Sequence, residues 1–197
     1  MTSIIYVIIL IGSVVLHELA HAWTAYKLGD PTAWLEGRIT FNPLAHLDMF
    51  GSVILPLLLV LTGSPFIIGW AKPVPFNPHN FSNPKWGAAL VAVMGPVTNI
   101  LIALVAAGIL LVVPVSSLIL TAILQVVIIT NIALAVFNMV PIPPLDGHHI
   151  LFALIPDRYA SIKYQLQKYS MGLVIVFVIF GWKFIEPLVS WLFELLV

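Results

Sequence analysis

The chain has no cysteine, and only 8% of its 197 residues are charged. The lack of cysteine excludes disulfides and thiolate metal ligands, so that His, Asp or Glu would have to bind any metal. A soluble domain typically carries about 25% charged residues, whereas 61% of this chain is hydrophobic. Its net charge is zero and no basic tract stands out, which argues against nucleic-acid binding. We therefore expect an all-α, polytopic protein embedded in a lipid bilayer.

Four apolar stretches are long enough to cross a bilayer as helices, which takes about 20 residues. They cover residues 3–26, 86–113, 118–140 and 170–197. The last contains Lys183, Glu186 and Pro187, so it forms either one tilted helix or a span followed by a surface helix, and we favour one helix. We expect a single domain over residues 1–197, with its core at 3–155 and a C-terminal helix region at 170–197.

A further apolar run, at residues 51–62, is too short for a span and is interrupted by Pro56. The breaker cluster Thr62-Gly63-Ser64-Pro65 follows it. We therefore expect residues 51–76 to form a re-entrant segment, which enters and leaves the membrane on one side. Just before it, the alternation of residues 35–41 predicts a short strand, so a small membrane-associated β element should accompany the helices.

Basic residues are unevenly distributed along the chain. Seven of the eight Lys and Arg residues fall in three polar segments that flank the spans, and the turn near Pro114 has none. Because positive charge favours the cytoplasmic side of a membrane, we expect these three segments to be cytoplasmic. The seven residues are Lys27, Arg38, Lys72, Lys85, Arg158, Lys163 and Lys168.

The first apolar stretch contains the sequence His17-Glu18-Leu19-Ala20-His21. On a helix, positions i and i+4 share one face, so both imidazoles can bind a single metal ion. In the H-E-x-x-H pattern the glutamate, here Glu18, is the general base that takes a proton from water whose pKa zinc has lowered to about 7. The pattern alone also occurs by chance. Three ionisable residues within a stretch of only five residues inside a membrane span are costly, however, and this indicates a functional zinc site.

A catalytic zinc site keeps three protein ligands and an open fourth position. The best candidate for the third ligand is Asp146, which returns to the side of the histidines if the short segment is re-entrant. His148 and His149 are alternative ligands, whereas Glu36 and Asp48 lie on a loop that we expect to be exposed. Asp146 could also cap the N-terminus of a helix. We expect one Zn²⁺ per chain, bound by the two histidines and Asp146 roughly 8 to 14 Å below the membrane surface.

Several motifs together resemble those of the site-2 proteases, intramembrane zinc metalloproteases of peptidase family M50. They are His17-Glu18-x-x-His21, Gly95-Pro96-x-x-Asn99 and Asn138-x-x-Pro141-x-Pro143-x-Leu145-Asp146-Gly147. Residues 42–48 and 69–75 resemble the compact bacterial and archaeal branch without PDZ or CBS domains. The resemblance, over residues 10–154, implies that Asp146 is the third ligand and that Asn138 lies near the scissile carbonyl. It further implies a substrate-binding edge strand formed by Gly69, Trp70, Ala71, Lys72, Pro73 and Val74. We interpret Asn99 as a residue that packs helices.

The resemblance implies an intramembrane zinc metalloendopeptidase that hydrolyses peptide bonds within or near transmembrane segments of substrate proteins. Its location would be a prokaryotic cell membrane, with the active site near the cytoplasmic side. The sequence leaves the oligomeric state open. An alternative function is that of a metal-binding membrane scaffold or chaperone without proteolytic activity. The presence of Glu18 argues against this alternative. A transporter is disfavoured because residues 86–145 contain no charge to line a polar path.

Overall fold

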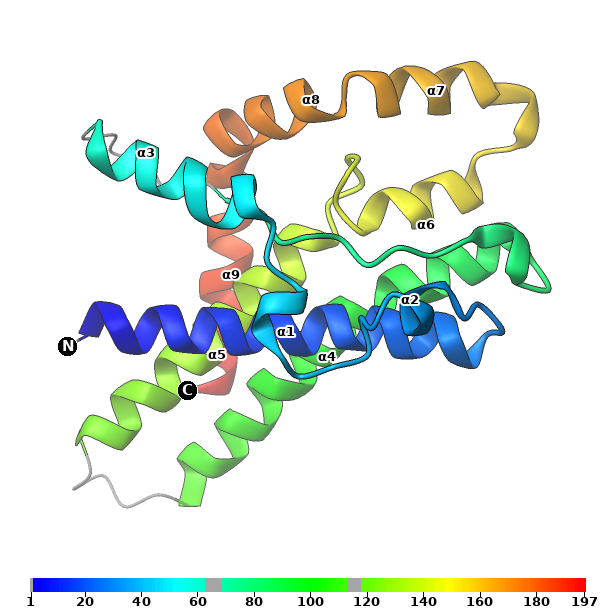
Figure 1. The fold of residues 1–197 in the computed structure, drawn as a ribbon. Helices are drawn as coiled ribbons and strands as arrows, with labels where there is room; N and C mark the ends of the chain where they lie inside the picture. The colour runs from blue at the N-terminus through cyan, green and yellow to red at the C-terminus, as the bar shows by residue number, and fades with distance from the viewer. Residues whose placement is uncertain (1, 63–68, 113–117) are drawn as a thin grey trace.

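Three long helices form the body of the molecule. The computed structural model describes residues 2–62, 69–112 and 118–197. α1 (Thr2–Lys27) lies against α4 (Pro84–Val112), and α4 lies against α5 (Leu118–Asn138) (Figure 1). A fourth helical region, Ser170–Leu196, is like these three long and apolar enough to cross a membrane. The predicted all-α polytopic fold is confirmed, and the first three spans lie where the sequence predicts them.

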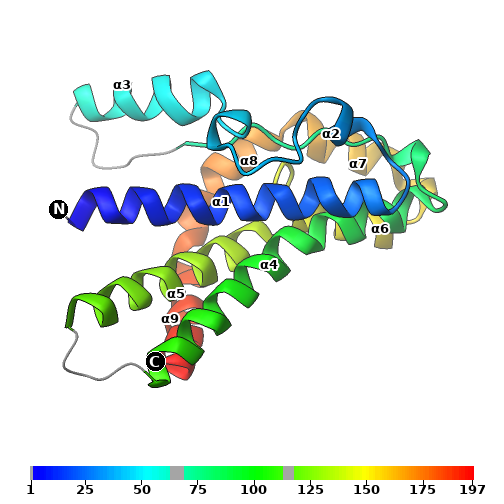
Figure 2. The ribbon, with the colours of Figure 1, turned by 60° about the horizontal axis from the view of Figure 1, so that its bottom comes forward.

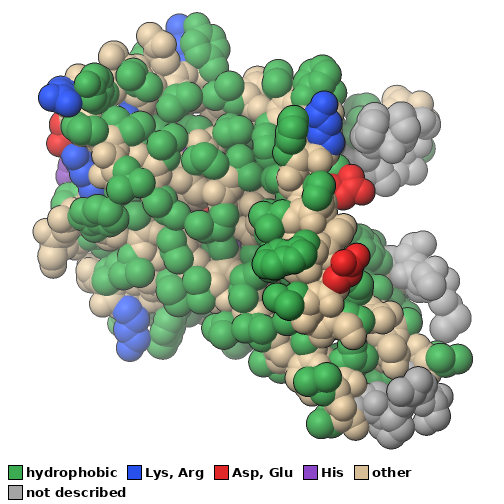
Figure 3. Space-filling view, turned by 180° about the vertical axis from the view of Figure 1, so that it is seen from behind, with side chains coloured by type: hydrophobic (Ala, Val, Ile, Leu, Met, Phe, Trp, Pro, Cys, Tyr) green, Lys and Arg blue, Asp and Glu red, His purple; other side chains and the backbone are tan. Residues whose placement is uncertain are grey.

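Small residues let these helices approach one another closely. Ala22 and Ala25 of α1 are completely buried, and α4 buries a series of alanines together with Gly95 and Pro96. Such residues are typical of helix contacts within membranes. Many bulky apolar side chains instead point outward, and the rear face of the molecule is mostly hydrophobic (Figure 3). A bilayer can therefore surround this bundle.

The C-terminal region is one helical stretch with a bend. After α6 (Gly147–Leu154), the turn at Asp157–Tyr159 and α7 (Ala160–Lys168), the chain forms α8 (Ser170–Val176), a π-helical segment (Phe177–Gly181) and α9 (Trp182–Leu196). Helices often bend at such π segments. α9 crosses α5 and runs across the direction of α1 in both views (Figures 1 and 2). The favoured single helix is thus continuous but not straight.

The predicted re-entrant segment leaves the body of the protein and comes back to the same place. A π-helical turn at Met49–Ile54 leads into α3 (Leu55–Leu61), which runs along the N-terminal half of α1 but apart from it (Figure 2). Residues 63–68 of this segment lie outside the described residues. Where the chain resumes, the Trp70 N–H donates to the Gly51 carbonyl at 3.2 Å. Residues 51 and 70 of the segment are therefore neighbours, and the re-entrant topology itself stays a prediction.

The predicted strand at residues 35–41 is wrong. A short helix, α2 (Thr32–Leu35), begins after Pro31 and ends in a turn at Gly37, whose φ of 68° is strained for residues with a side chain. The Arg38 N–H donates back to the Ala33 carbonyl, so this backbone is folded rather than extended. The turn at Gly37 therefore prevents the strand that the alternating pattern predicts. In the described part of the chain, β structure consists of one antiparallel bridge, between Leu47 and Ala71.

Candidate metal centre

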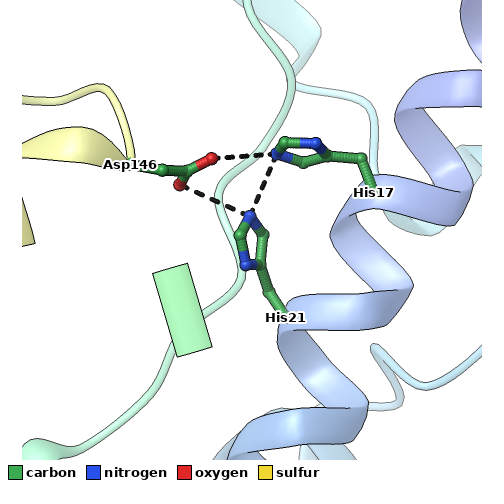
Figure 4. Close-up of side chains that lie close together, drawn as sticks. All are labelled: His17, His21 and Asp146. Atoms are coloured by element: carbon green, nitrogen blue, oxygen red, sulfur yellow. Dashed lines mark hydrogen bonds and ion pairs between the residues drawn. The ribbon is translucent and has the colours of Figure 1, made fainter. Parts of the chain in front are cut away.

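Three side chains from two separate parts of the chain meet beside α4. His17 and His21 project from one face of α1 toward Asp146, which lies just before α6 (Figure 4). The Nε2 atom of His17 lies 3.0 Å from Asp146 Oδ2 and 3.0 Å from His21 Nε2. His21 Nε2 lies 3.3 Å from Asp146 Oδ1. Within the described residues, this is the group of His, Asp and Glu side chains whose spacing could hold a metal ion.

The other nitrogen of each imidazole is bound by α4. His21 Nδ1 lies 2.8 Å from the Val91 carbonyl oxygen, and His17 Nδ1 lies 2.5 Å from Asn99 Oδ1. Both partners are acceptors, so each Nδ1 carries the proton of its neutral ring. Both Nε2 atoms are then unprotonated and point into the cluster. α4 thus holds the two rings in the tautomer that a metal site needs.

The cluster is suited to a cation because it brings acceptors together without a donor. Two Nε2 lone pairs and the Asp146 carboxylate face one another at 3.0 to 3.3 Å. Ligands of a tetrahedral zinc ion with Zn–N bonds of about 2.1 Å lie about 3.4 Å apart. A zinc ion between the three side chains would satisfy all of these acceptors. The chemistry and the spacing of the donors therefore fit the predicted zinc.

Gly95 of α4 provides the space for the imidazoles. A Cβ atom at this position would overlap the rings of both His21 and His17. The glycine is buried and is followed by Pro96, which is buried as well. Only a residue without a side chain lets α4 approach the ligand face of α1 this closely.

Asp146 is placed by the turns that follow α5. It occupies the N-cap position of α6, yet its side chain makes no capping hydrogen bond and points to the histidines instead. A Cβ atom on the next residue, Gly147, would overlap the backbone of Met139, so the chain folds tightly at this point. The carboxylate of Asp146 therefore faces both imidazoles.

The alternative ligands do not join the cluster. His148 is buried and directs Nδ1 to the Leu145 carbonyl at 2.7 Å, while the His149 ring lies tilted against the rings of His148 and Phe76. Asp48 accepts a hydrogen bond from the Gly51 N–H and thereby caps the π-helical turn that precedes α3. Glu36 is exposed on the turn after α2. Of the candidates for the third ligand, the structure brings Asp146 to the histidines.

The two predicted catalytic residues differ in how they are held. Glu18 follows His17 on α1, is half-buried, and forms no hydrogen bond or ion pair with another described residue. Its carboxylate is thus available beside the metal cluster. Asn138 is the last residue of α5, and its Nδ2 donates to the Leu134 carbonyl one turn earlier at 3.0 Å. In this arrangement its amide is engaged within its own helix.

The segment predicted to bind substrate is extended and passes close to the site. Val74 packs against Ala22, the neighbour of His21, and against Ala33. Two residues later, the Phe76 ring contacts the His149 ring, with centroids 5.3 Å apart. The segment therefore runs between α1 and α6, the two helices next to the metal ligands. It forms a single bridge with Leu47 and no longer ladder among the described residues, so it is a shorter β element than an edge strand.

Sequence reasoning underestimates Asn99 and misses Asn131 and Ser13. Asn99 contacts a metal-ligand candidate directly, and behind it Asn131 and Ser13 continue a buried hydrogen-bonded chain. The signal in the sequence is weak but present, because each is a polar residue within an apolar span, where polar groups need partners. The identity of those partners depends on how the spans pack, which the sequence does not state.

The chain is similar over most of its length to bacterial proteins named as candidate zinc metalloproteases. The profile of peptidase family M50 matches residues 113–180. YwhC of Bacillus subtilis is 36% identical over 193 residues, which cover 94% of this chain and 82% of that protein. Rip2 of Mycobacterium tuberculosis (strain H37Rv) is 30% identical over 97% of this chain and 74% of its own length. For Rip2 of Mycolicibacterium smegmatis the values are 28%, 97% and 72%. No solved structure matches the chain significantly.

Proposed function

Because the chain belongs to peptidase family M50 and is a multi-pass membrane zinc metalloendopeptidase, we propose that it cleaves other proteins within or near their transmembrane segments. The observation that carries this proposal is the position of the cluster formed by His17, His21 and Asp146. Its histidines lie within a long apolar helix, six and ten residues before Lys27. At about 1.5 Å per residue, this is roughly 9 to 15 Å from the polar end of α1. A peptide bond must enter the membrane region to reach them.

The proposed roles follow from the geometry of the site. The two histidines and Asp146 would hold one Zn²⁺, which at such a site polarises a carbonyl and lowers the pKa of a coordinated water to about 7. Glu18, free of partners in the described structure, is the proposed general base, and it returns the proton to the leaving amine. Asn138 is proposed to bind the scissile carbonyl, for which its amide must exchange the bond to Leu134 for one to the substrate.

The extended segment offers a backbone edge for a substrate strand. The backbone groups of Trp70 and Lys72 are engaged on one side, where the Lys72 N–H donates to the His46 carbonyl at 2.9 Å and Ser52 Oγ donates to the Trp70 carbonyl at 2.7 Å. In an extended chain the groups of the residue between them point to the opposite edge. The N–H and C=O of Ala71 form no hydrogen bond with the described residues. We propose that an unwound substrate segment pairs with Ala71, which compensates for lost helical hydrogen bonds.

The proposed orientation places the site near the cytoplasmic face of a prokaryotic cell membrane. Most of the Lys and Arg side chains visible on the rear face gather at the end where α1 ends and α4 begins (Figure 3). Lys85 at the start of α4 pairs with Asp157 at 2.7 Å, which brings the segment before α7 to the same end. Since positive charge favours the cytoplasmic side, this end would face the cytoplasm.

The proposed function is tested by expressing the protein together with a library of single-span membrane proteins. The wild type is compared with Glu18→Gln, which retains the size and hydrogen bonding of the side chain but cannot accept a proton. We expect cleavage products only with the wild type, while the variant still binds zinc and captures uncut substrate. Equal cleavage by both proteins would refute the role of Glu18. Capture of many partners without cleavage by the wild type would instead support the metal-binding scaffold.

A further inference from the structure

We propose that Asn131 of α5 is a positioning residue, which orients the Asn99 amide and through it fixes the tautomer of His17. The inference rests on the proposed role of His17 as a zinc ligand, and adds a residue from a third helix to the site. Asn131 lies outside the sequence motifs described above and does not touch the metal cluster. It acts through hydrogen bonds that run from α1 through α4 to α5.

A series of hydrogen bonds connects α1, α4 and α5. From His17 Nδ1 it passes to Asn99 Oδ1, then from Asn99 Nδ2 to Asn131 Oδ1 at 2.8 Å. Asn131 Nδ2 donates at 2.9 Å to Ser13 Oγ, which lies one turn before His17 on α1. Asn99 and Asn131 are both 0% exposed. No solvent is therefore at hand to replace any of these bonds.

The direction of this chain is set by a backbone carbonyl. Asn131 Nδ2 also donates to the carbonyl oxygen of Val127 at 2.9 Å. That oxygen can only accept, so a flipped Asn131 amide would place two acceptors against each other. The amide is thus held with its Oδ1 toward Asn99, and this oxygen in turn requires the NH₂ group of Asn99 at that place. The Asn99 Oδ1 is left to face His17.

As a consequence, the position of the proton on the His17 ring is fixed. With an oxygen against Nδ1, the His17 ring keeps its proton there and directs the lone pair of Nε2 to the cluster. A flipped Asn99 would present an NH₂ group to Nδ1 and favour the opposite tautomer, in which Nε2 is protonated and cannot bind zinc. Hydrogen-bond partners of metal-bound histidines typically change metal affinity by 10- to 100-fold. Asn131 therefore supports zinc binding from a distance.

The matched comparison is Asn131→Leu against Thr130→Val. Thr130 is the preceding residue of α5, is also buried at 4% exposed, and its hydroxyl has no hydrogen-bond partner among the described residues. Zinc affinity of each purified variant is measured in detergent by competition with a chelator, and the metal-free protein is melted as a control for folding. We expect Asn131→Leu to lose about tenfold or more in zinc affinity, and Thr130→Val to match the wild type.

A double-mutant cycle decides whether Asn131 acts through Asn99. If it does, Asn99→Leu already removes the effect, so adding Asn131→Leu should lower zinc affinity no further. Nitrogen NMR of ¹⁵N-histidine-labelled, metal-free protein reads the tautomer directly. We expect a His17 signal with protonated Nδ1 in the wild type and a mixture of tautomers in Asn131→Leu. Additive losses of affinity with an unchanged tautomer would overturn the proposal and leave Asn131 as a packing residue.

A conservative variant covers the case that Asn131→Leu does not fold. Burial between apolar helices keeps a carboxyl group neutral, so Asn131→Asp can donate its O–H to Val127 and accept from Asn99. We expect this variant to bind zinc nearly as the wild type does. A loss as large as that of Asn99→Leu would contradict the proposal. These outcomes are distinct from failure of the proposed function, in which the wild type itself would not bind zinc through His17.

Discussion

A histidine can bind a metal through either of its two ring nitrogens, and in this protein α4 determines which one. The Val91 carbonyl and the Asn99 amide oxygen each accept a hydrogen bond from Nδ1 of one ring, and Gly95 leaves room for both rings. The H-E-x-x-H pattern thus supplies the candidate ligands, while α4 holds them in the tautomer that metal binding needs. The geometry of the site therefore depends on residues of α4 as much as on those of α1.

Substitution of Gly95 tests the fit between α4 and the imidazoles. In Gly95→Ala the added methyl group overlaps the rings of His17 and His21, so we expect zinc affinity to fall at least tenfold, or about 1.4 kcal/mol. Gly108→Ala on the same helix is the control, because a Cβ there meets no atom within 4 Å. Metal analysis after dialysis against a chelator compares the two. Equal zinc retention would show that the rings move aside without loss.

Removal of the third ligand tests the assignment of Asp146. In Asp146→Ala two imidazoles remain without the carboxylate that faces both. We expect this variant to lose bound zinc on dialysis and to lose all peptidase activity. Asp157→Ala serves as control, since Asp157 is exposed and pairs only with lysines. Full zinc occupancy in Asp146→Ala would transfer the role to His148 or His149.

The sequence predicts the ligands better than their surroundings, for a physical reason. Two histidines one turn apart on a helix share a face in any fold, so the positions of His17 and His21 follow from helical geometry alone. The role of Asp146 required in addition that residues 51–76 return to the same side. The contacts of Asn99 and Asn131 depend on how three helices rotate against one another. Apolar periodicity does not determine that rotation to the accuracy of a hydrogen bond.

The connection between α1 and α4 depends on one buried carboxylate. Asp30, 0% exposed, accepts hydrogen bonds from the backbone and hydroxyl of Thr32, from the Asn77 N–H and from Asn80 Nδ2. Burial alone would raise the pKa of Asp30, but these donors lower it below its ordinary value. Its ionised form therefore stabilises the fold above the ordinary carboxyl pKa. That contribution is lost as the pH falls through the lower folded-state pKa.

We expect Asp30→Asn to lose about 1 to 3 kcal/mol of stability at neutral pH. The NH₂ group of the asparagine would face N–H and O–H donors and could not accept the hydrogen bonds that they give to the carboxylate. The difference from the wild type should shrink as the pH falls from about 4 through the lower folded-state pKa, at which the wild-type carboxylate becomes protonated. Thermal unfolding in detergent at both pH values measures this. A constant difference across the range would show that the charge of Asp30 is not involved.

The re-entrant course of residues 51–76 stays a prediction of the sequence. It follows from an apolar run too short to span and from basic flanks, and the structure adds one hydrogen bond between Trp70 and Gly51. The strand predicted at residues 35–41 is wrong because the alternation of polar and apolar residues does not reveal the turn at Gly37. Short irregular elements depend on single turn residues, whereas long spans depend on many residues at once.

Cysteine labelling tests the sidedness of this segment in the cysteine-free chain. Leu44 and His79 flank the segment and are exposed, and Leu118 at the start of α5 is exposed at the other end of the bundle. We expect an impermeant thiol reagent to label Leu44→Cys and His79→Cys from one side of the membrane and Leu118→Cys from the other. Labelling of the first two from opposite sides would mean that the segment crosses the membrane.

The whole bundle encloses the candidate metal centre within an apolar exterior. The outer surface is hydrophobic, while the metal cluster lies inside, 5% to 6% exposed at the two histidines. Hydrolysis at this depth requires a substrate whose backbone reaches the cluster unpaired, since a helix keeps its carbonyls in hydrogen bonds. The backbone of Ala71 and the carboxylate of Glu18, neither of which is hydrogen-bonded to another described residue, are consistent with such a substrate.

The most direct test of this account is to locate the bond that the enzyme cuts. Purified protein is reconstituted in liposomes with a cleaved single-span substrate, and mass spectrometry identifies the new termini. The account predicts cleavage within the apolar segment, roughly 9 to 15 Å from its cytoplasmic boundary to match the depth of His17 and His21, and no cleavage by Glu18→Gln. Cleavage confined to the water-exposed flanks of the substrate would contradict it.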